Sequence, residues 1–301
     1  MESFASKAMK FILSFFLIIL MTGCRGGKGS RQASSTGQPY EVVVEGDTDS
    51  IVTKILTEDV PALPQPEPLC NVINVKRGKV KGSYQMVRTR IVVDITPRHK
   101  AFSAKTTRDE DASPQLVIRI KAKSVEQLRA TFYNKSGELS KKEEPNKNAE
   151  LLRSTIDQSE LQHLASIIKQ NPEKQREVKR MFGLDMKIPA SLDASKKAKG
   201  FLWLSNNAST GMQNLLIFKA SNSKQIDSIL KKNMVGETDN MYMSIPQLSE
   251  RGLWEMVGDA MGGPYVMRRK GNFVVIGFVY APEMKKRNLL KQLEAVLTTI
   301  K

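Results

Sequence analysis

The chain has 301 residues, of which 47 are Lys or Arg and 31 are Asp or Glu, so its formal net charge is +16. A hydrophobic share of 40% is ordinary for a globular protein and excludes a chain that is disordered along its whole length. With two cysteines and two histidines, the composition excludes a disulfide framework and gives no support to a zinc site. We therefore expect neither a metal nor any other cofactor.

The first 24 residues have the pattern of a bacterial lipoprotein signal. Lys7 and Lys10 lead into an apolar run, FILSFFLIIL, which is shorter than the ~20 residues that cross a bilayer. The next four residues, MTGC, resemble the lipobox, in which the cysteine is diacylated and becomes the mature N-terminus. We therefore expect residues 1–23 to be a signal peptide and Cys24 to carry the lipid. An ordinary signal peptide followed by an incidental cysteine is the alternative.

Residues 24–39, CRGGKGSRQASSTGQP, are rich in Gly and Ser, which is typical of a flexible tether. Two or more acyl chains hold a protein firmly to a membrane, and no later stretch approaches 18 apolar residues. The tether lacks the acidic run that, in lipoproteins of the Bacteroidetes type, resembles a surface-export signal. We therefore expect a periplasm-facing protein held in the outer membrane, in preference to the inner membrane.

Residues 40–123 alternate strand and helix patterns and are expected to form an N-terminal α/β part. A helix is predicted over 47–60, with Asp47 or Asp49 as its cap. Four prolines within 61–68 predict an extended connector, and 98–114 is expected to be a polar loop. Strands are predicted over 40–46, 69–75, 90–96 and 114–122, the last two largely buried.

Cys70 lies between apolar neighbours in the second of these predicted strands, LCNVINV. Cys24 is assigned to the lipid, so Cys70 has no partner for an intramolecular disulfide. No histidine lies near it in the sequence to act as a base. We therefore expect a buried, inert cysteine rather than a nucleophile.

Residues 124–183 change to a helical pattern. Ser124 is the expected cap of a first helix, and 149–170 carries apolar residues at helical spacing. A third helix is expected over 172–183, because Pro172 suits its first position and Gly183 its end. This segment is expected to lie between the N-terminal part and a C-terminal part that spans 184–301.

Residues 184–301 predict three strands and a helix, twice over. The strands are expected over 185–192, 200–206, 213–220, 253–259, 264–270 and 272–281. One helix is expected over 221–233, and an amphipathic helix is expected from Pro282 to the C-terminus. The whole order predicts an α+β fold with mainly antiparallel sheets and packed helices.

Several stretches together resemble an uncharacterised lipoprotein family of the Bacteroidetes, known as domain of unknown function 4837. They are GQPYEVVV, VPALPQPEPL, RIVVDI, GLWEMVGDAMGGPYV and FVYAPEMKKRNLLKQLEAVLTT, and they span roughly residues 37–300. The sequence departs from this pattern at Cys70, where a large apolar residue is expected. The resemblance implies a cell-envelope setting. It implies no activity, so no catalytic residue is carried over from it.

The stretch 251–266, RGLWEMVGDAMGGPYV, places two carboxylates close together in the sequence. In a strand, Glu255 and Asp259 would lie ~13 Å apart, beyond the ~5–9.5 Å of paired carboxylates in glycosidases. The glycines and Pro264 argue against a helix, which would bring the pair closer. We therefore assign no catalytic residue and expect a strand, a turn or a bulge at 262–264 and a second strand, with Trp254 in the core.

A binding surface beside that turn is the functional alternative for the same stretch. The residues that would border such a groove are Arg251, Trp254, Glu255, Asp259 and Tyr280.

The positive charge favours anionic partners, but it is dispersed over several segments that also carry acids. No basic motif with interleaved aromatic residues occurs, and an envelope address argues against nucleic acid. We therefore expect a non-catalytic binding or scaffolding lipoprotein. Its partners would be the membrane, through Cys24, and an envelope protein or an anionic envelope ligand. The alternative is an envelope enzyme that acts on an anionic lipid or glycan.

Overall fold

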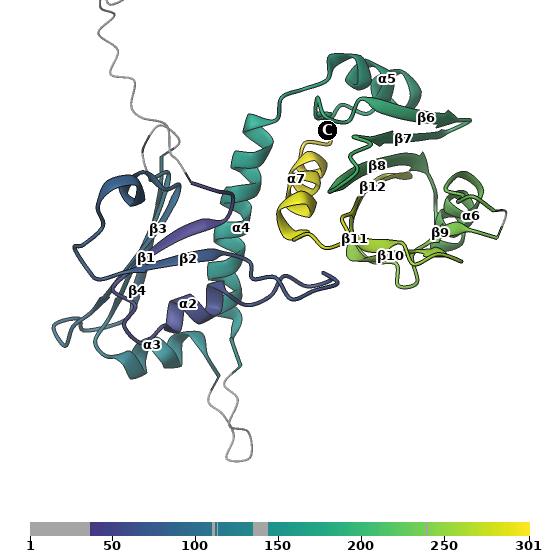
Figure 1. The fold of residues 1–301 in the computed structure, drawn as a ribbon. Coiled ribbons are helices and arrows are strands. Elements are labelled where there is room, and N and C mark those ends of the chain that lie inside the picture. Colours follow the sequence, from purple (N-terminus) through teal and green to yellow (C-terminus); the bar gives the residue numbers. More distant parts are fainter. Residues whose placement is uncertain (1–36, 110–111, 113, 135–143, 239) are drawn as a thin grey trace, which may run out of the picture. The chain divides into compact units, whose positions relative to one another are not determined.

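The computed structural model describes residues 37–109, 112, 114–134, 144–238 and 240–301. The expected signal peptide, Cys24 and most of the expected tether lie outside these ranges. The described residues form two β-sheets and six α-helices, which confirms the predicted α+β class (Figure 1). Among the helices described, none combines the length and apolar character needed to cross a membrane.

The first sheet has the strand order β2-β1-β3-β5-β4. Its first four strands are parallel neighbours, and the edge strand β4 runs antiparallel to β5. Parallel strands need crossover connections, and the short helix α2 lies in the crossover from β1 to β2. The elements are β1 (Glu41–Glu45), α2 (Ile51–Leu56), β2 (Asn71–Val75), β3 (Thr89–Ile95), β4 (Ser103–Arg108) and β5 (Leu116–Ala122).

The prediction of a polar loop over 98–114 is wrong where β4 lies. Every residue of β4 is exposed, so the strand has no apolar alternation by which the sequence could reveal it. Its backbone pairs with β5 instead, with Lys105 opposite Arg119. The prediction of a largely buried β5 is also wrong, because Arg119 and Lys121 alternate with buried isoleucines and are exposed.

Helices cover one face of the first sheet. The helices α2, α3 (Val125–Phe132) and α4 (Lys147–Ile167) share one core cluster with Val44, Ile91 and Ile118 of the strands. Ser124 caps α3 as predicted, since its side chain accepts a hydrogen bond from the Gln127 N–H at 3.2 Å.

The opposite face of the first sheet is covered only in part. Val80 and Val87, on either side of a 3-10 helix (Gly82–Met86), are buried against Val43 of β1. We call residues 76–87 the covering segment, and it lies over the strands β1 and β2. Over β3, β5 and β4 the described residues leave the sheet exposed, and we call this surface the open face. It carries half-buried or exposed residues, which are Arg90, Val92, Asp94, Ser103, Lys105, Thr107, Val117, Arg119 and Lys121.

The second sheet is antiparallel throughout, in the order β6-β7-β8-β12-β11-β10-β9. Its strands are β6 (Ala194–Ala198), β7 (Phe201–Ser205), β8 (Met212–Lys219), β9 (Tyr242–Ser244), β10 (Arg251–Val257), β11 (Gly262–Lys270) and β12 (Phe273–Tyr280).

Both faces of the second sheet are packed. In β8, Leu215 and Ile217 share a cluster with α5 (Pro172–Phe182) and α7 (Arg287–Thr298), whereas Leu216 and Phe218 share another with α6 (Ser223–Asn233). Successive strand residues point to opposite faces, so near-continuous apolar runs such as NLLIF are what a sheet covered on both sides requires.

Several elements in this part differ from the predictions, and the strands β6 and β9 were not predicted. Residues 185–192 form no strand, and their only β-pairing with other described residues is an isolated bridge at Pro189. The apolar residues Met186 and Ile188 pack instead in the cluster with α5 and α7. The last helix begins at Arg287, not at Pro282.

In place of the turn or bulge expected at 262–264, these residues begin β11 and pair in regular register with β10. Gly263 is required there for a different reason. A Cβ at this position would lie 2.2 Å from the Val279 carbonyl oxygen.

Candidate functional site

The stretch 251–266 forms the β10–β11 hairpin, and Trp254 is part of the core as predicted. Its side chain is 3% exposed, and its indole Nε1–H donates to the Val279 carbonyl at 3.1 Å. The ring lies edge-on to Phe278, with 5.0 Å between centroids. Trp254 is therefore a packing residue of the α6 side of the sheet.

The other residues of the predicted groove are dispersed. Arg251 lies on the α7 side of the sheet and forms an ion pair with Glu294 at 2.5 Å. Tyr280 lies on the Trp254 side, with 6.4 Å between ring centroids. Glu255 and Asp259 are exposed. The structure thus brings Trp254 together with Tyr280, and it separates both from Arg251.

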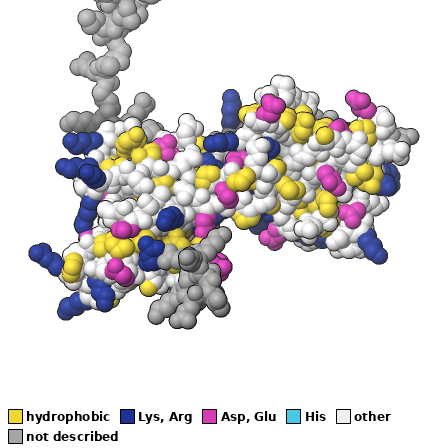
Figure 2. All heavy atoms as spheres, turned by 60° about the horizontal axis from the view of Figure 1, so that its bottom comes forward, with side chains coloured by type: hydrophobic (Ala, Val, Ile, Leu, Met, Phe, Trp, Pro, Cys, Tyr) yellow, Lys and Arg dark blue, Asp and Glu magenta, His cyan; other side chains and the backbone are white. Residues whose placement is uncertain are grey.

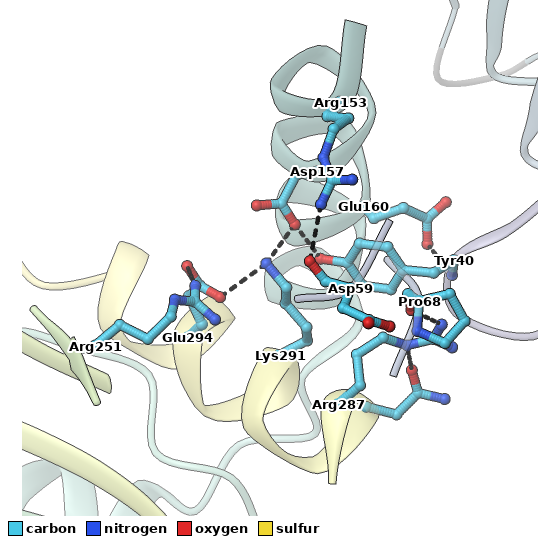
Figure 3. A network of polar contacts seen from close by, with 11 residues as sticks. Tyr40, Asp59, Pro68, Arg153, Asp157, Glu160, Arg251, Arg287, Lys291 and Glu294 are labelled. Atoms are coloured by element: carbon cyan, nitrogen blue, oxygen red, sulfur yellow. Dashed lines mark hydrogen bonds and ion pairs between the residues drawn. The ribbon is translucent and has the colours of Figure 1, made fainter. Parts of the chain in front are cut away.

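Arg251 leads instead into a network of buried charges between α4 and α7 (Figure 3). Lys291 of α7 is 2% exposed, and its Nζ lies 2.6 Å from Asp157 Oδ1 and 3.0 Å from Glu294 Oε2. Two carboxylates therefore compensate the burial of this ammonium group, which would be costly without them. Tyr40 donates its hydroxyl proton to the same Asp157 oxygen at 2.6 Å.

A second ion pair extends the network around Tyr40. Glu160 of α4 accepts from the Tyr40 backbone N–H at 3.1 Å and pairs with Arg88 at 3.2 Å. Burial, and after it the charge of Asp157, raise the pKa of the Tyr40 phenol far above its usual range. Tyr40 is therefore neutral at physiological pH and acts as a hydrogen-bond donor, not as a nucleophile.

Glu67 closes the network at the start of α7. Its two carboxylate oxygens accept from the backbone N–H groups of Lys286, at 2.6 Å, and Arg287, at 3.0 Å. The first turn of a helix has unpaired N–H groups and a partial positive charge, so a carboxylate stabilises it. The Arg287 guanidinium donates to the Pro68 carbonyl at 2.5 Å and lies 5.6 Å from the Tyr40 ring centroid.

These contacts have a structural role. We call the network of Tyr40, Glu67, Asp157, Glu160 and Lys291 with their partners the joint. The buried Lys291, Glu160 and Glu67 each have an oppositely charged or hydrogen-bonding partner within the chain. The contacts that Tyr40, Asp157, Glu160 and Glu67 make in this network join residues 72 to 220 positions apart. No local spacing could have indicated it.

A candidate binding site lies beside the joint, at the C-terminal end of α4. It is a cavity of about 360 Å³ with a mainly apolar lining. Its lining residues are Leu164, Ile167, Ile168, Lys169, Pro189, Ala190, Ser191, Leu192, Gln213, Gln292, Leu293 and Val296. We call it the α4–α7 groove.

The polar groups of the α4–α7 groove are mostly neutral. Gln213 donates through Nε2 to the Leu289 carbonyl at 2.9 Å and to Gln292 Oε1 at 3.0 Å, which fixes its amide at the wall. Lys169 is the charged residue of the lining. Ile167 stands at the rim and is 62% exposed. Such a lining suits an apolar chain or side chain with an occasional amide contact.

Among the described residues, no group of three or more His, Cys, Asp and Glu side chains could hold a metal ion. Cys70 is buried, as predicted, and burial raises the pKa of its thiol to about 12. The thiolate is the nucleophilic form of cysteine, so this thiol is unreactive in the folded protein.

Comparison with known families divides the chain in two. Residues 171–299 match the family model described as a domain of unknown function, DUF4837. The predicted resemblance is confirmed for this part, whereas residues 35–169 match a separate model, the domain of unknown function DUF8532. No curated protein and no solved structure matches the chain. The α4–α7 groove therefore combines residues of the DUF8532 and DUF4837 parts.

Proposed function

We propose that this protein is a lipid-anchored component of the cell envelope that faces the periplasm from the outer membrane and binds another envelope component without catalysis. The charged start, apolar run and MTGC motif of the first 24 residues support the anchor. The partner would be a protein or an anionic envelope ligand.

The observation that carries the binding role is the α4–α7 groove. Hydrolysis of a lipid or glycan commonly uses a nucleophile with a base, or two carboxylates at a suitable distance. Among the described residues, the lining of the groove consists of apolar residues with Ser191, two glutamines and one lysine, and it includes neither a histidine to serve as a base nor a carboxylate. This chemistry favours holding an apolar segment of a partner over transforming a substrate.

Photo-crosslinking of the membrane-anchored protein tests the binding role, with a crosslinker placed at Ser191 in the groove. Ile167→Asp puts a charge at the apolar rim and should abolish the crosslinked species. Leu151→Asp is the matched control, because Leu151 lies on the same helix, is 64% exposed and is not part of the groove. Equal crosslinking by both variants would contradict the role of the groove. A hydrolytic activity that a single polar substitution abolishes would favour the enzyme alternative.

Palmitate labelling tests the anchor separately. The full chain should incorporate palmitate and sediment with membranes, and Cys24→Ala should do neither. A Cys24→Ala protein that still labels and still sediments would refute lipidation at this residue.

A further inference from the structure

The open face of the first sheet carries basic side chains that none of the described helices covers. Arg119 and Lys121 are exposed on β5, and Lys105 of β4 lies directly opposite Arg119. Their neighbours Ile118 and Ile120 are buried in the helical core, so strand alternation directs the basic residues away from it.

The carboxylates of Glu45 and Asp94, on the same side of this sheet, already form ion pairs with basic side chains. Glu45 pairs with Arg90 and accepts from the Gly78 N–H, whereas Asp94 pairs with Arg77 and with His99, the latter at 3.1 Å. Burial alone would raise both pKa values, but these partners outweigh it, and the pKa of each carboxyl lies below its usual range. Neither acid is therefore left to balance Lys105, Arg119 or Lys121.

Adjacent loops extend the positive surface. Lys76, Lys79 and Lys81 of the covering segment are exposed, as are Arg98 and Lys100 after β3. Within the described residues, none of these five, nor Lys105, Arg119 or Lys121, forms an ion pair with a carboxylate. Figure 2 shows Lys and Arg side chains standing out along the left side of the molecule, over the part built on the first sheet.

We propose that the open face, with its two basic loops, docks on anionic phospholipid headgroups of the membrane to which Cys24 anchors the chain. The proposal rests on the proposed anchor. Cys24 is 13 positions before Gly37, so the intervening chain reaches at most ~45 Å and keeps the sheet close to that membrane. Each Lys or Arg near an anionic bilayer strengthens binding by a small, additive amount.

The composition of the surface favours a lipid partner over a nucleic acid. Single-stranded nucleic acids are held by aromatic residues on which bases stack, and the open face has none. Tyr84 is the exposed aromatic residue of the covering segment, at 44% exposure, and Val92 and Val117 are half-buried between the basic side chains. An amphipathic ring beside lysines is typical of a membrane interface.

Vesicle sedimentation with the full chain tests this proposal. The partition coefficient is measured on vesicles of phosphatidylcholine with and without phosphatidylglycerol. The triple variant Lys105→Gln, Arg119→Gln, Lys121→Gln should lower the anionic-over-neutral binding ratio about 100-fold, since each charge contributes about 5-fold. The matched variant Lys199→Gln, Lys224→Gln, Lys232→Gln removes the same charge from exposed positions in the DUF4837 part. It should change the ratio less than about 3-fold, because screening confines the effect to nearby charges.

The two proposals fail in different ways. Loss of the anchor in Cys24→Ala lowers binding to neutral and anionic vesicles alike, whereas loss of the basic face lowers only the anionic excess. Equal loss in both triple variants would overturn the proposal, because net charge would then explain the binding. No anionic excess in the full chain, or full displacement from anionic vesicles by a single-stranded oligonucleotide, would also overturn it.

Discussion

The two sheets differ in how many of their faces are covered. The second sheet buries both faces, under α5 and α7 on one side and α6 on the other. The first sheet buries one face under α2, α3 and α4, and over β3, β5 and β4 its other face is exposed. The residue types match this difference in coverage. In β8, the four residues after Asn214 are all apolar, so both faces of the strand are apolar there. In β5, the segment IRIKA alternates apolar and basic residues.

This difference separates stability from interaction. A residue in a doubly covered sheet is constrained by packing on either face. A residue on the open face is constrained by packing on one side of its strand only, which leaves its own side chain free for other uses. Substitutions in the second sheet should therefore lower stability, and substitutions on the open face should leave stability unchanged while changing binding.

The largest expected effect is that of Trp254→Ala. Removing this buried ring, which contacts Phe278 and donates to Val279, should lower the free energy of unfolding by about 4 kcal/mol. Val117→Ala, on the half-buried open face, should cost less than about 1 kcal/mol. Urea denaturation followed by circular dichroism measures both. Equal costs would show that coverage does not distinguish the two sheets.

Gly263→Ala should have the next largest effect. The added Cβ would lie 2.2 Å from the Val279 carbonyl, so the β11–β12 pair must shift, at a cost of about 2 kcal/mol. Gly271→Ala is the comparison, because nothing lies within 4 Å of a Cβ there and only its positive φ of 59° opposes alanine. That strain costs about 1 kcal/mol. A smaller loss at Gly263 than at Gly271 would refute the close approach as the reason for this glycine.

A smaller effect is expected from acid. The folded-state pKa values of Glu45 and Asp94 are lowered by their arginine partners. Their contribution to stability is therefore present above pH ~4 and is lost as the pH falls through the folded-state values. The variant Glu45→Gln, Asp94→Asn should show a shallower loss of unfolding free energy between about pH 5 and pH 3. An unchanged slope, measured by urea titrations across that range, would mean that these pairs do not stabilise the open face.

The smallest effect is expected from Lys105→Gln, Arg119→Gln, Lys121→Gln. These side chains are exposed and have no carboxylate partner among the described residues, so the unfolding free energy should change by less than about 0.5 kcal/mol. The thermal midpoint checks this directly. A loss of several degrees would assign the basic residues a structural role and would weaken the comparison between the sheets.

Local patterns were enough to predict much of the fold. The Ser124 cap, the helix from Pro172 to Gly183 and the burial of Trp254 follow from residue type and spacing, because each depends on neighbours within a turn or a strand. β4 was missed because a strand exposed on both faces has no periodic signal. The turn was misplaced because glycines are used for close approach as well as for turns.

The joint and the groove were beyond reach of a single sequence. Tyr40, Asp157 and Lys291 come together only when the two regions that match different family models pack against each other. The spacing of residues in the sequence does not predict which residues meet in such packing. The open face did have a local signal. The alternation of Ile118, Arg119, Ile120 and Lys121 indicates a half-exposed strand, but the expectation of a largely buried strand obscured it.

The cap that Glu67 provides for α7 has a consequence for the order of folding. The two groups are 219 positions apart, and α7 follows the strands of both sheets in the chain. A contact between residues so far apart in the sequence forms only after a long loop has closed. The conformational entropy lost in closing that loop makes the contact form late in folding. We expect both sheets to be formed before α7 binds, so that its docking is the final, rate-limiting step. Until α7 binds, part of one apolar face of the second sheet would be uncovered, and chaperones would recognise it there.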